Sequence, residues 1–169
     1  MKNKLWFWPA LIVGTAADQA TKLLAFRHLE QGEYLRLIPY VLGLTTSENK
    51  GALFGMLPGS GALLALFSVA ALGVILWFLH RAPQQGKCLP AALGMIAAGA
   101  TGNLIDRTFN NGMVRDFIDL HVGPYQLRQW WSHWPTFNIA DALICIGVAM
   151  VIYAEFKKPK AKQPVVDNQ

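Results

Sequence analysis

The chain has 169 residues, of which 53% are hydrophobic and only 15% are charged, and its mean hydropathy is +0.30. Soluble domains carry about 25% charged residues, so this composition excludes an ordinary soluble domain and predicts an integral membrane protein. We attribute the net charge of +5 to membrane topology, and we expect no nucleic-acid partner.

The first apolar segment covers residues 5–26 and is interrupted by Asp18 and Lys22. Because these two residues are four apart, they share a helical face and can pair; we favour a structural role for the pair over a catalytic one. The basic start and the small residues at 15–17 resemble a secretory signal. The apolar run continues to Phe26 and three more apolar segments follow, so we expect a retained membrane anchor.

The segment 32–55 differs from its neighbours because it mixes β-branched, aromatic and turn-forming residues, among them Pro39 and Gly43. This mixture predicts short extended segments at the membrane surface. Further apolar segments follow at 61–79, 89–105 and 137–154, and the last contains Asp141. About 20 apolar residues cross a bilayer as a helix. The sequence therefore predicts an all-α membrane protein, a four-transmembrane-helix bundle forming one domain over residues 1–169.

The positive charges indicate the orientation of these helices. Segments 1–4, 80–88 and 155–169 hold eight Lys and Arg in 28 residues, whereas 27–58 and 106–136 hold six in 63. Because Lys and Arg are enriched in cytoplasmic loops, we expect both termini to be cytoplasmic and 27–58 and 106–136 to be extracytoplasmic. The lysine-rich tail, 155–169, is either a contact for anionic membrane lipids or a solubilising end.

Two aspartates stand out as candidates for chemistry. Asp116 lies in the segment 106–136 and Asp141 near the start of the last apolar segment, so both fall at the same face of the predicted bundle. An ionisable residue at membrane depth is costly and is a functional candidate by default. Two carboxyls that share a site cannot both ionise cheaply, so one keeps a proton. The charged one can then deprotonate water while the other polarises a carbonyl.

Other interpretations of these residues remain open. Asp119 lies three residues after Asp116 and would share its face in a helical turn, although we interpret it as a solvated charge. Asp141 could instead cap a helix N-terminus. A metal site using Asp116 and His121 is conceivable, but motifs for zinc or serine catalysis are absent from the sequence. We expect neither a metal nor a cofactor.

Two other classes of membrane protein remain as alternatives. A proton-coupled membrane transporter would relay protons between the aspartates, but such proteins place the site near mid-bilayer within repeated halves, and no repeat is visible here. A membrane scaffold would need no converging carboxyls.

Five short stretches, in order along the chain, resemble motifs of the bacterial lipoprotein signal peptidases of type II, a family of intramembrane aspartyl proteases. They are Asp18-Gln19-Ala20-Thr21-Lys22, Asn49-Lys50-Gly51-Ala52-Leu53-Phe54, Gly99-Ala100-Thr101-Gly102-Asn103-Leu104-Ile105-Asp106-Arg107, Val114-Arg115-Asp116-Phe117 and Phe137-Asn138-Ile139-Ala140-Asp141.

The resemblance implies that Asp116 and Asp141 form a catalytic dyad. It implies an endopeptidase that removes the signal peptide from diacylglyceryl-modified prolipoproteins, cleaving before the lipidated cysteine at the outer face of the cytoplasmic (inner) membrane. It also implies that the region 32–55 forms a small extracytoplasmic β-cradle. We expect the enzyme to act as a monomer.

Further residues of these motifs are expected to bind substrate or support the site: Asp18, Lys22, Asn49, Gly51, Asn103, Asp106, Arg107 and Asn138. The asparagines are suited to orienting the dyad, since each offers donors and an acceptor. A guanidinium at Arg107 could bind a carbonyl or carboxylate, and Asp106 is either a substrate contact or part of an interfacial charge cluster. We expect Asp18 to tie the surface region to the helices.

Two residues depart from the family pattern. Arg115 stands where an apolar residue is usual, and we expect its charge to lower the pKa of the dyad. Ala98 stands where a glycine is common, and we expect a slightly looser helix approach there.

Overall fold

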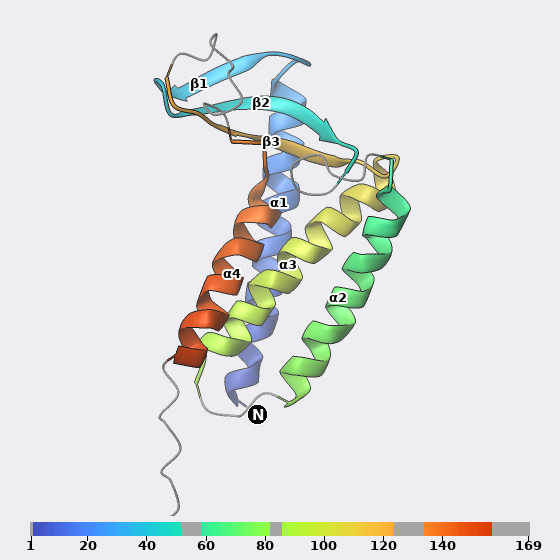
Figure 1. Ribbon diagram of the computed structural model, residues 1–169, viewed down its shortest axis with the longest axis vertical. Helices are drawn as coiled ribbons and strands as arrows, with labels where there is room; N and C mark the ends of the chain where they lie inside the picture. The colour runs from blue at the N-terminus through green and yellow to red at the C-terminus, as the bar shows by residue number, and fades with distance from the viewer. Residues whose placement is uncertain (1, 52–58, 82–85, 124–133, 157–169) are drawn as a thin grey trace, which may run out of the picture.

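The computed structural model of the chain describes residues 2–51, 59–81, 86–123 and 134–156. Four long helices lie side by side, and a small sheet lies across one end of them (Figure 1). The helical elements are η1 (Lys2–Trp6), α1 (Phe7–His28), α2 (Gly61–Arg81), α3 (Cys88–Phe109) and α4 (Ile139–Phe156). The predicted mostly helical fold is confirmed.

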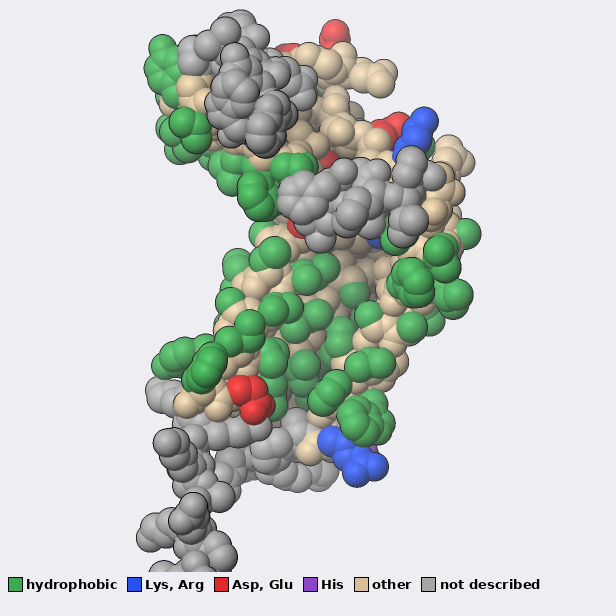
Figure 2. Space-filling view, in the orientation of Figure 1, with side chains coloured by type: hydrophobic (Ala, Val, Ile, Leu, Met, Phe, Trp, Pro, Cys, Tyr) green, Lys and Arg blue, Asp and Glu red, His purple; other side chains and the backbone are tan. Residues whose placement is uncertain are grey.

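Three helices, α2, α3 and α4, are long and apolar enough to cross a membrane. The other long helix, α1, has 22 residues, a length of about 33 Å at 1.5 Å per residue. It carries the buried charges of Asp18 and Lys22, which dilute its apolar character. On the face that Figure 2 shows, hydrophobic side chains lie over the helices, and charged side chains gather toward the two ends.

The sheet has three antiparallel strands in the order β1 (Tyr34–Ile38), β2 (Leu42–Asn49) and β3 (Val114–Leu120). The first two lie in the region that the sequence predicts to be extended. The third strand comes from the segment that follows α3, and the sequence analysis did not predict it. The register places Ser47 opposite Asp116 and Asn49 opposite Val114, after a bulge between Leu44 and Ser47.

The helix α3 packs against α1, α2 and α4, and its small residues permit close approach. A Cβ atom on Gly99 would lie 2.3 Å from the carbonyl oxygen of Ala140 in α4. The neighbouring Ala98 is fully buried, and a Cβ on Gly14 of α1 would lie 2.8 Å from its methyl group. The expected looser approach at Ala98 is therefore not found, because the facing helix supplies the glycine.

The end of the bundle away from the sheet has an apolar core. Its buried residues, contributed by α1, α2 and α3, are Phe7, Ile75, Leu79, Leu93 and Ala97. This cluster holds the helices together at that end, while the sheet end is held largely by polar contacts.

Candidate functional site

Backbone hydrogen bonds fasten the start of α4 to the strand β3. The amide of Ile118 donates to the carbonyl of Phe137 at 2.9 Å, and the amide of Phe137 donates to the carbonyl of Ile118 at 3.0 Å. Asn138 and Asp141 follow directly, and Asp116 lies two residues before Ile118. This short bridge brings the two predicted motifs to one place, beneath the sheet.

The side chain of Asp116 is 2% exposed and accepts hydrogen bonds from two asparagines. Nδ2 of Asn138 donates to Oδ1 at 2.6 Å, and Nδ2 of Asn49 donates to Oδ2 at 3.1 Å. Burial, with the nearby charge of Asp141, raises the pKa of Asp116 from 3.8 to about 7, although both asparagines and Lys22 oppose the shift. The pKa of Asp116 is thus raised overall, and Arg115 is not among the groups that shift it.

Asp141 lies in the first turn of α4, where it forms a reciprocal cap with Asn138. The amide of Asp141 donates to Oδ1 of Asn138 at 3.0 Å, and the amide of Asn138 donates to Oδ2 of Asp141 at 3.3 Å. This is the capping-box arrangement, with Asn138 before the helix and Asp141 three residues later. The helix-cap interpretation of Asp141 is thus correct in geometry. Its other oxygen, Oδ1, accepts a hydrogen bond from Nδ2 of Asn103 at 2.9 Å.

Asn138 contacts both carboxylates, through its side chain to Asp116 and through its backbone to Asp141. Its side-chain Nδ2 is also 3.2 Å from Oδ1 of Asn103. The asparagines therefore form a connected set around the acids, so each carboxyl is held in a fixed orientation. The predicted positions of Asn49, Asn103 and Asn138 beside the dyad agree with this geometry.

Lys22 lies behind the asparagines and is completely buried. Its ammonium donates to Oδ1 of Asn103 at 3.1 Å and forms ion pairs with Asp18 at 2.9 Å and Asp106 at 3.1 Å. The ion pair predicted from the four-residue spacing is present. A buried charge requires such partners, since an unpaired one costs several kcal/mol.

Asp18 also accepts a hydrogen bond from the amide of Ala140 at 2.9 Å, in the first turn of α4. The side chain therefore ties α1 to the N-terminus of α4. The expectation that it ties the surface region to the helices is wrong.

Asp106 is 1% exposed and forms a second ion pair, with Arg115, whose side chain is partly exposed. The guanidinium Nη2 lies 2.6 Å from Oδ1 of Asp106, and the backbone amide of Arg115 donates to Oδ2 at 2.9 Å. Asp106 is therefore an internal anchor between α3 and β3 and not an interfacial charge cluster. Arg115 precedes Asp116 in a strand, where successive side chains point to opposite faces, so its charge is directed to Asp106.

Gly51 and Arg107 meet at the edge of the site. Nη2 of Arg107 donates to the carbonyl oxygen of Gly51 at 3.2 Å, and the amide of Gly51 donates to Oδ1 of Asn49 at 2.9 Å. The guanidinium lies close enough to interact electrostatically with Asp141 and Asp116. Its Nε is buried without a hydrogen-bond partner in the described part of the chain, which leaves one donor for a ligand.

Asp119 does not join the pair of aspartates. It is 2% exposed, and its Oδ2 lies 3.1 Å from Nδ1 of His121. The interpretation of Asp119 as a solvated charge is wrong. Because Asp116 is an odd number of positions away from both Asp119 and His121, strand alternation directs the latter two away from it. His121 instead contacts Asp119 and, at 3.2 Å, the hydroxyl of Tyr34.

Gln19, a residue of the first motif, belongs to this network, and the sequence did not predict a role for it. Nε2 of Gln19 donates to Asp18 at 3.0 Å and to the carbonyl of Gly102 at 3.1 Å, while its Oε1 accepts from Arg115 at 3.1 Å. Its polar side chain in an apolar segment beside Asp18 was the available signal.

Comparisons with known proteins agree with this architecture. A family model described as Signal peptidase (SPase) II matches residues 10–157. A lipoprotein signal peptidase of Chlorobium phaeovibrioides is 43% identical over 152 residues, covering 87% of this chain and 88% of that protein. One of Geobacter sulfurreducens is 35% identical over 168 residues, covering 97% and 100% respectively.

Among solved structures, a bacterial membrane enzyme determined by the in meso method superposes with a TM-score of 0.80. It is 30% identical and covers 94% of this chain and 92% of its own. The match of the family model, the curated relatives and the shared fold lead to one conclusion: this chain belongs to the signal peptidase II family, a family of membrane proteases.

Proposed function

We propose that the protein is an aspartic endopeptidase that removes the signal peptide from diacylglyceryl-modified prolipoproteins, with Asp116 and Asp141 as its catalytic residues. The names of its relatives support the substrate class. The observation that carries the mechanism is the position of Asn138, which hydrogen-bonds to both carboxylates.

In this mechanism the two acids share one proton. Asp116, whose pKa is raised to about 7, holds the proton in the active form, which is half populated near pH 7 and dominant below it, and Asp141 is the charged base. Asp141 takes a proton from a water molecule as its oxygen attacks the scissile carbonyl, while Asp116 donates its proton to the carbonyl oxygen. Collapse of the tetrahedral intermediate breaks the C–N bond, and the leaving amine takes a proton from the dyad.

The remaining site residues hold this arrangement. Asn49, Asn103 and Asn138 are positioning residues, because each orients a carboxylate through a hydrogen bond. Lys22 in turn fixes Asn103 by donating to its Oδ1. Arg107 offers its unused Nε–H to the substrate backbone, beside Gly51.

The proposed setting is a bacterial inner membrane. The helix α1 would be the fourth span, with both termini in the cytoplasm and the three-stranded sheet at the outer face. Cleavage would occur before the lipidated cysteine, at the outer leaflet, by a monomer. The transporter alternative would place the acids near mid-bilayer, whereas Asp116 lies in β3 and Asp141 in the first turn of α4.

The test is release of the signal peptide from a lipidated precursor by purified protein in detergent. Because each carboxyl has its own proton-transfer role, Asp116→Asn and Asp141→Asn should each lower the rate by a factor of about 10³ or more. Asp119→Asn is the matched control, since Asp119 is equally buried but paired with His121. An active Asp116→Asn variant would overturn the assignment.

A further inference from the structure

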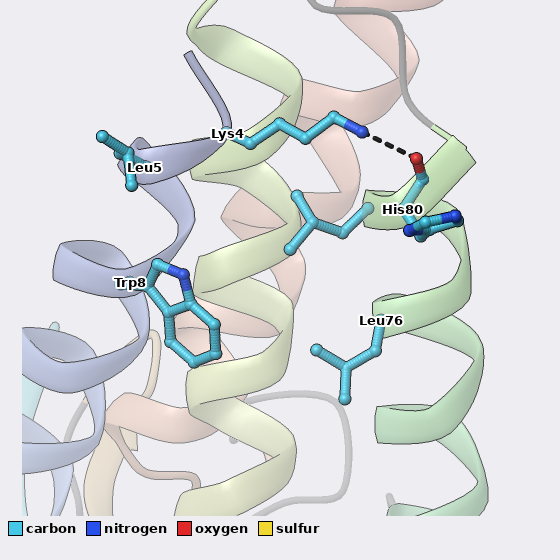
Figure 3. A pocket seen from close by; sticks show the side chains of 6 residues that line it. Lys4, Leu5, Trp8, Leu76 and His80 are labelled. Atoms are coloured by element: carbon cyan, nitrogen blue, oxygen red, sulfur yellow. Dashed lines mark hydrogen bonds between the residues drawn. The ribbon is translucent and has the colours of Figure 1, made fainter. Parts of the chain in front are cut away.

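A groove lies at the end of the bundle opposite the sheet, between η1 with the start of α1 on one side and the end of α2 on the other. It encloses about 370 Å³, within the range of ligand-binding cavities. Trp8 and Leu76 face each other across it, and Lys4 closes one end (Figure 3). The lining residues are Lys4, Leu5, Trp8, Leu76, Leu79 and His80.

The walls of the groove are apolar and open to the membrane side of the helices. Leu79 belongs to the buried apolar core, whereas Leu5, Trp8 and Leu76 are 61%, 49% and 48% exposed. Filling the groove with hydrocarbon would cover these side chains. A single acyl chain matches the polarity of these walls.

Lys4 lines the groove, and two further cations, Arg81 and Lys87, lie at the same end of the bundle without lining it. Nζ of Lys4 donates to the carbonyl of His80 at 2.6 Å and keeps further N–H groups for a ligand. Arg81 follows His80 with its guanidinium 5.5 Å from the ring centre of Trp77, and Nζ of Lys87 lies 5.1 Å from the ring centre of Trp6. These aromatic contacts hold two of the cations near the interface.

The same end carries little negative charge. Among the residues that the structure describes, the acidic side chain at this end of the bundle is Glu155 in α4. Figure 1 shows α4 and α2 on opposite sides of α3, so Glu155 is remote from the groove. In the described part of the chain, the groove therefore combines apolar walls with the ammonium of Lys4, and two more cations lie at the same end of the bundle.

We propose that this groove binds an anionic phospholipid, with one acyl chain between α1 and α2 and the head-group phosphate against Lys4, Arg81 and Lys87. Charge complementarity selects this occupant over a signal peptide, because the n-region of a signal peptide is itself positive and would be repelled. In the proposed topology the groove faces the cytoplasmic leaflet, which is rich in anionic lipids. The bound lipid would fix the spacing of α1 and α2.

The test is native mass spectrometry of the full chain, delipidated in detergent and titrated with phosphatidylglycerol or with phosphatidylcholine of the same acyl chains. Phosphatidylglycerol should bind more tightly. The double variant Lys4→Gln/Arg81→Gln should weaken its binding about tenfold or more, since each cation near the membrane surface contributes about fivefold. Lys4→Arg/Arg81→Lys should restore binding, because both charges return.

Two controls separate the head group from the acyl chain. Arg27→Gln removes one positive charge at the opposite end of α1, where Arg27 is exposed, and should leave lipid binding unchanged. Leu76→Trp fills the groove without changing charge and should weaken binding of phosphatidylglycerol. The proposal would be overturned if the two lipids bound with equal affinity, or if Lys4→Gln/Arg81→Gln bound lipid as well as Arg27→Gln does. It would also be overturned if Leu76→Trp left binding unchanged, or if free glycerol phosphate displaced the lipid.

Discussion

The two ends of the helix bundle are stabilised in different ways. Beneath the sheet, the buried side chains include charged residues such as Lys22, Asp18 and Asp106, each at most 1% exposed and each joined to a partner. At the opposite end the core consists of apolar residues such as Phe7 and Leu93. An apolar core tolerates replacement by side chains of similar volume. A buried polar network does not, because every donor and acceptor needs its partner.

The proposed mechanism gives this difference a functional reason. Two carboxyls can share a proton only if neighbouring groups hold them at a fixed separation and orientation. The asparagines hold the carboxyls directly through hydrogen bonds. The ion pairs of Lys22 and Arg115 in turn hold in place the helices and the strand around them. The contacts that stabilise the sheet end are therefore the same ones that position the aspartates, whereas stability at the other end depends mainly on apolar packing.

Removing the central cation should produce the largest loss of stability. Lys22→Met keeps the length of the side chain but leaves Asp18 and Asp106 as buried carboxylates without their shared ammonium. Breaking a buried ion pair in this way costs about 3–5 kcal/mol, which a thermal-unfolding measurement in detergent would detect. Lys50→Met, at an exposed position, is the control. Equal melting temperatures for the two variants would show that the network does not stabilise the fold.

Loss of the asparagine that contacts both acids should affect activity more than stability. Asn138→Ala removes the donor to Asp116 and the acceptor for the amide of Asp141. The missing cap costs about 1 kcal/mol, and the released carboxyls should lower the rate of peptide release about 100-fold. If release continued at the wild-type rate, the dyad would not depend on Asn138 for its orientation.

Adding one methyl group should distinguish close packing near the site from open helix surface. Gly99→Ala places a Cβ against the carbonyl of Ala140, so it should destabilise the protein by about 1–3 kcal/mol and displace the first turn of α4. Gly73→Ala is the matched control in α2, where nothing lies within 4 Å of the added atom. It should stabilise the helix by up to about 1 kcal/mol. The same stability for both variants would contradict the close α3–α4 contact.

Sequence patterns predicted the local features of this molecule well. Apolar segment lengths located the helices, and the four-residue spacing predicted the Asp18–Lys22 pair, because both depend on residues near one another in the chain. The motifs placed the asparagines beside the acids.

The strand β3 was not predicted. Its residues Val114–Leu120 are mostly buried on both faces, so the alternation of apolar and polar residues that marks a half-buried strand is absent. The turn before it uses left-handed backbone at Asn111 and Gly112. The pairs Arg115–Asp106 and Asp119–His121 depend on the path of that turn and strand. The partners of these charged side chains therefore could not be predicted from the sequence.

The raised pKa of Asp116 also gives the activity and the stability a defined dependence on pH. Between about pH 4 and about pH 7 the native protein holds a proton that the unfolded chain releases. The stability contributed by this group is therefore present at low pH and lost as pH rises through about 7. Activity should fall above the same pH, because the shared proton leaves the dyad.

Titration of Asp116 by carboxyl-selective infrared or NMR spectroscopy, in the wild type and in Asp141→Asn, tests the shared proton most directly. In the wild type Asp116 should titrate near pH 7. Removing the charge of Asp141 should lower that pKa, because the repulsion disappears while the hydrogen bonds from Asn49 and Asn138 remain. A pKa that stays the same in both proteins would contradict the coupling on which the proposed mechanism depends.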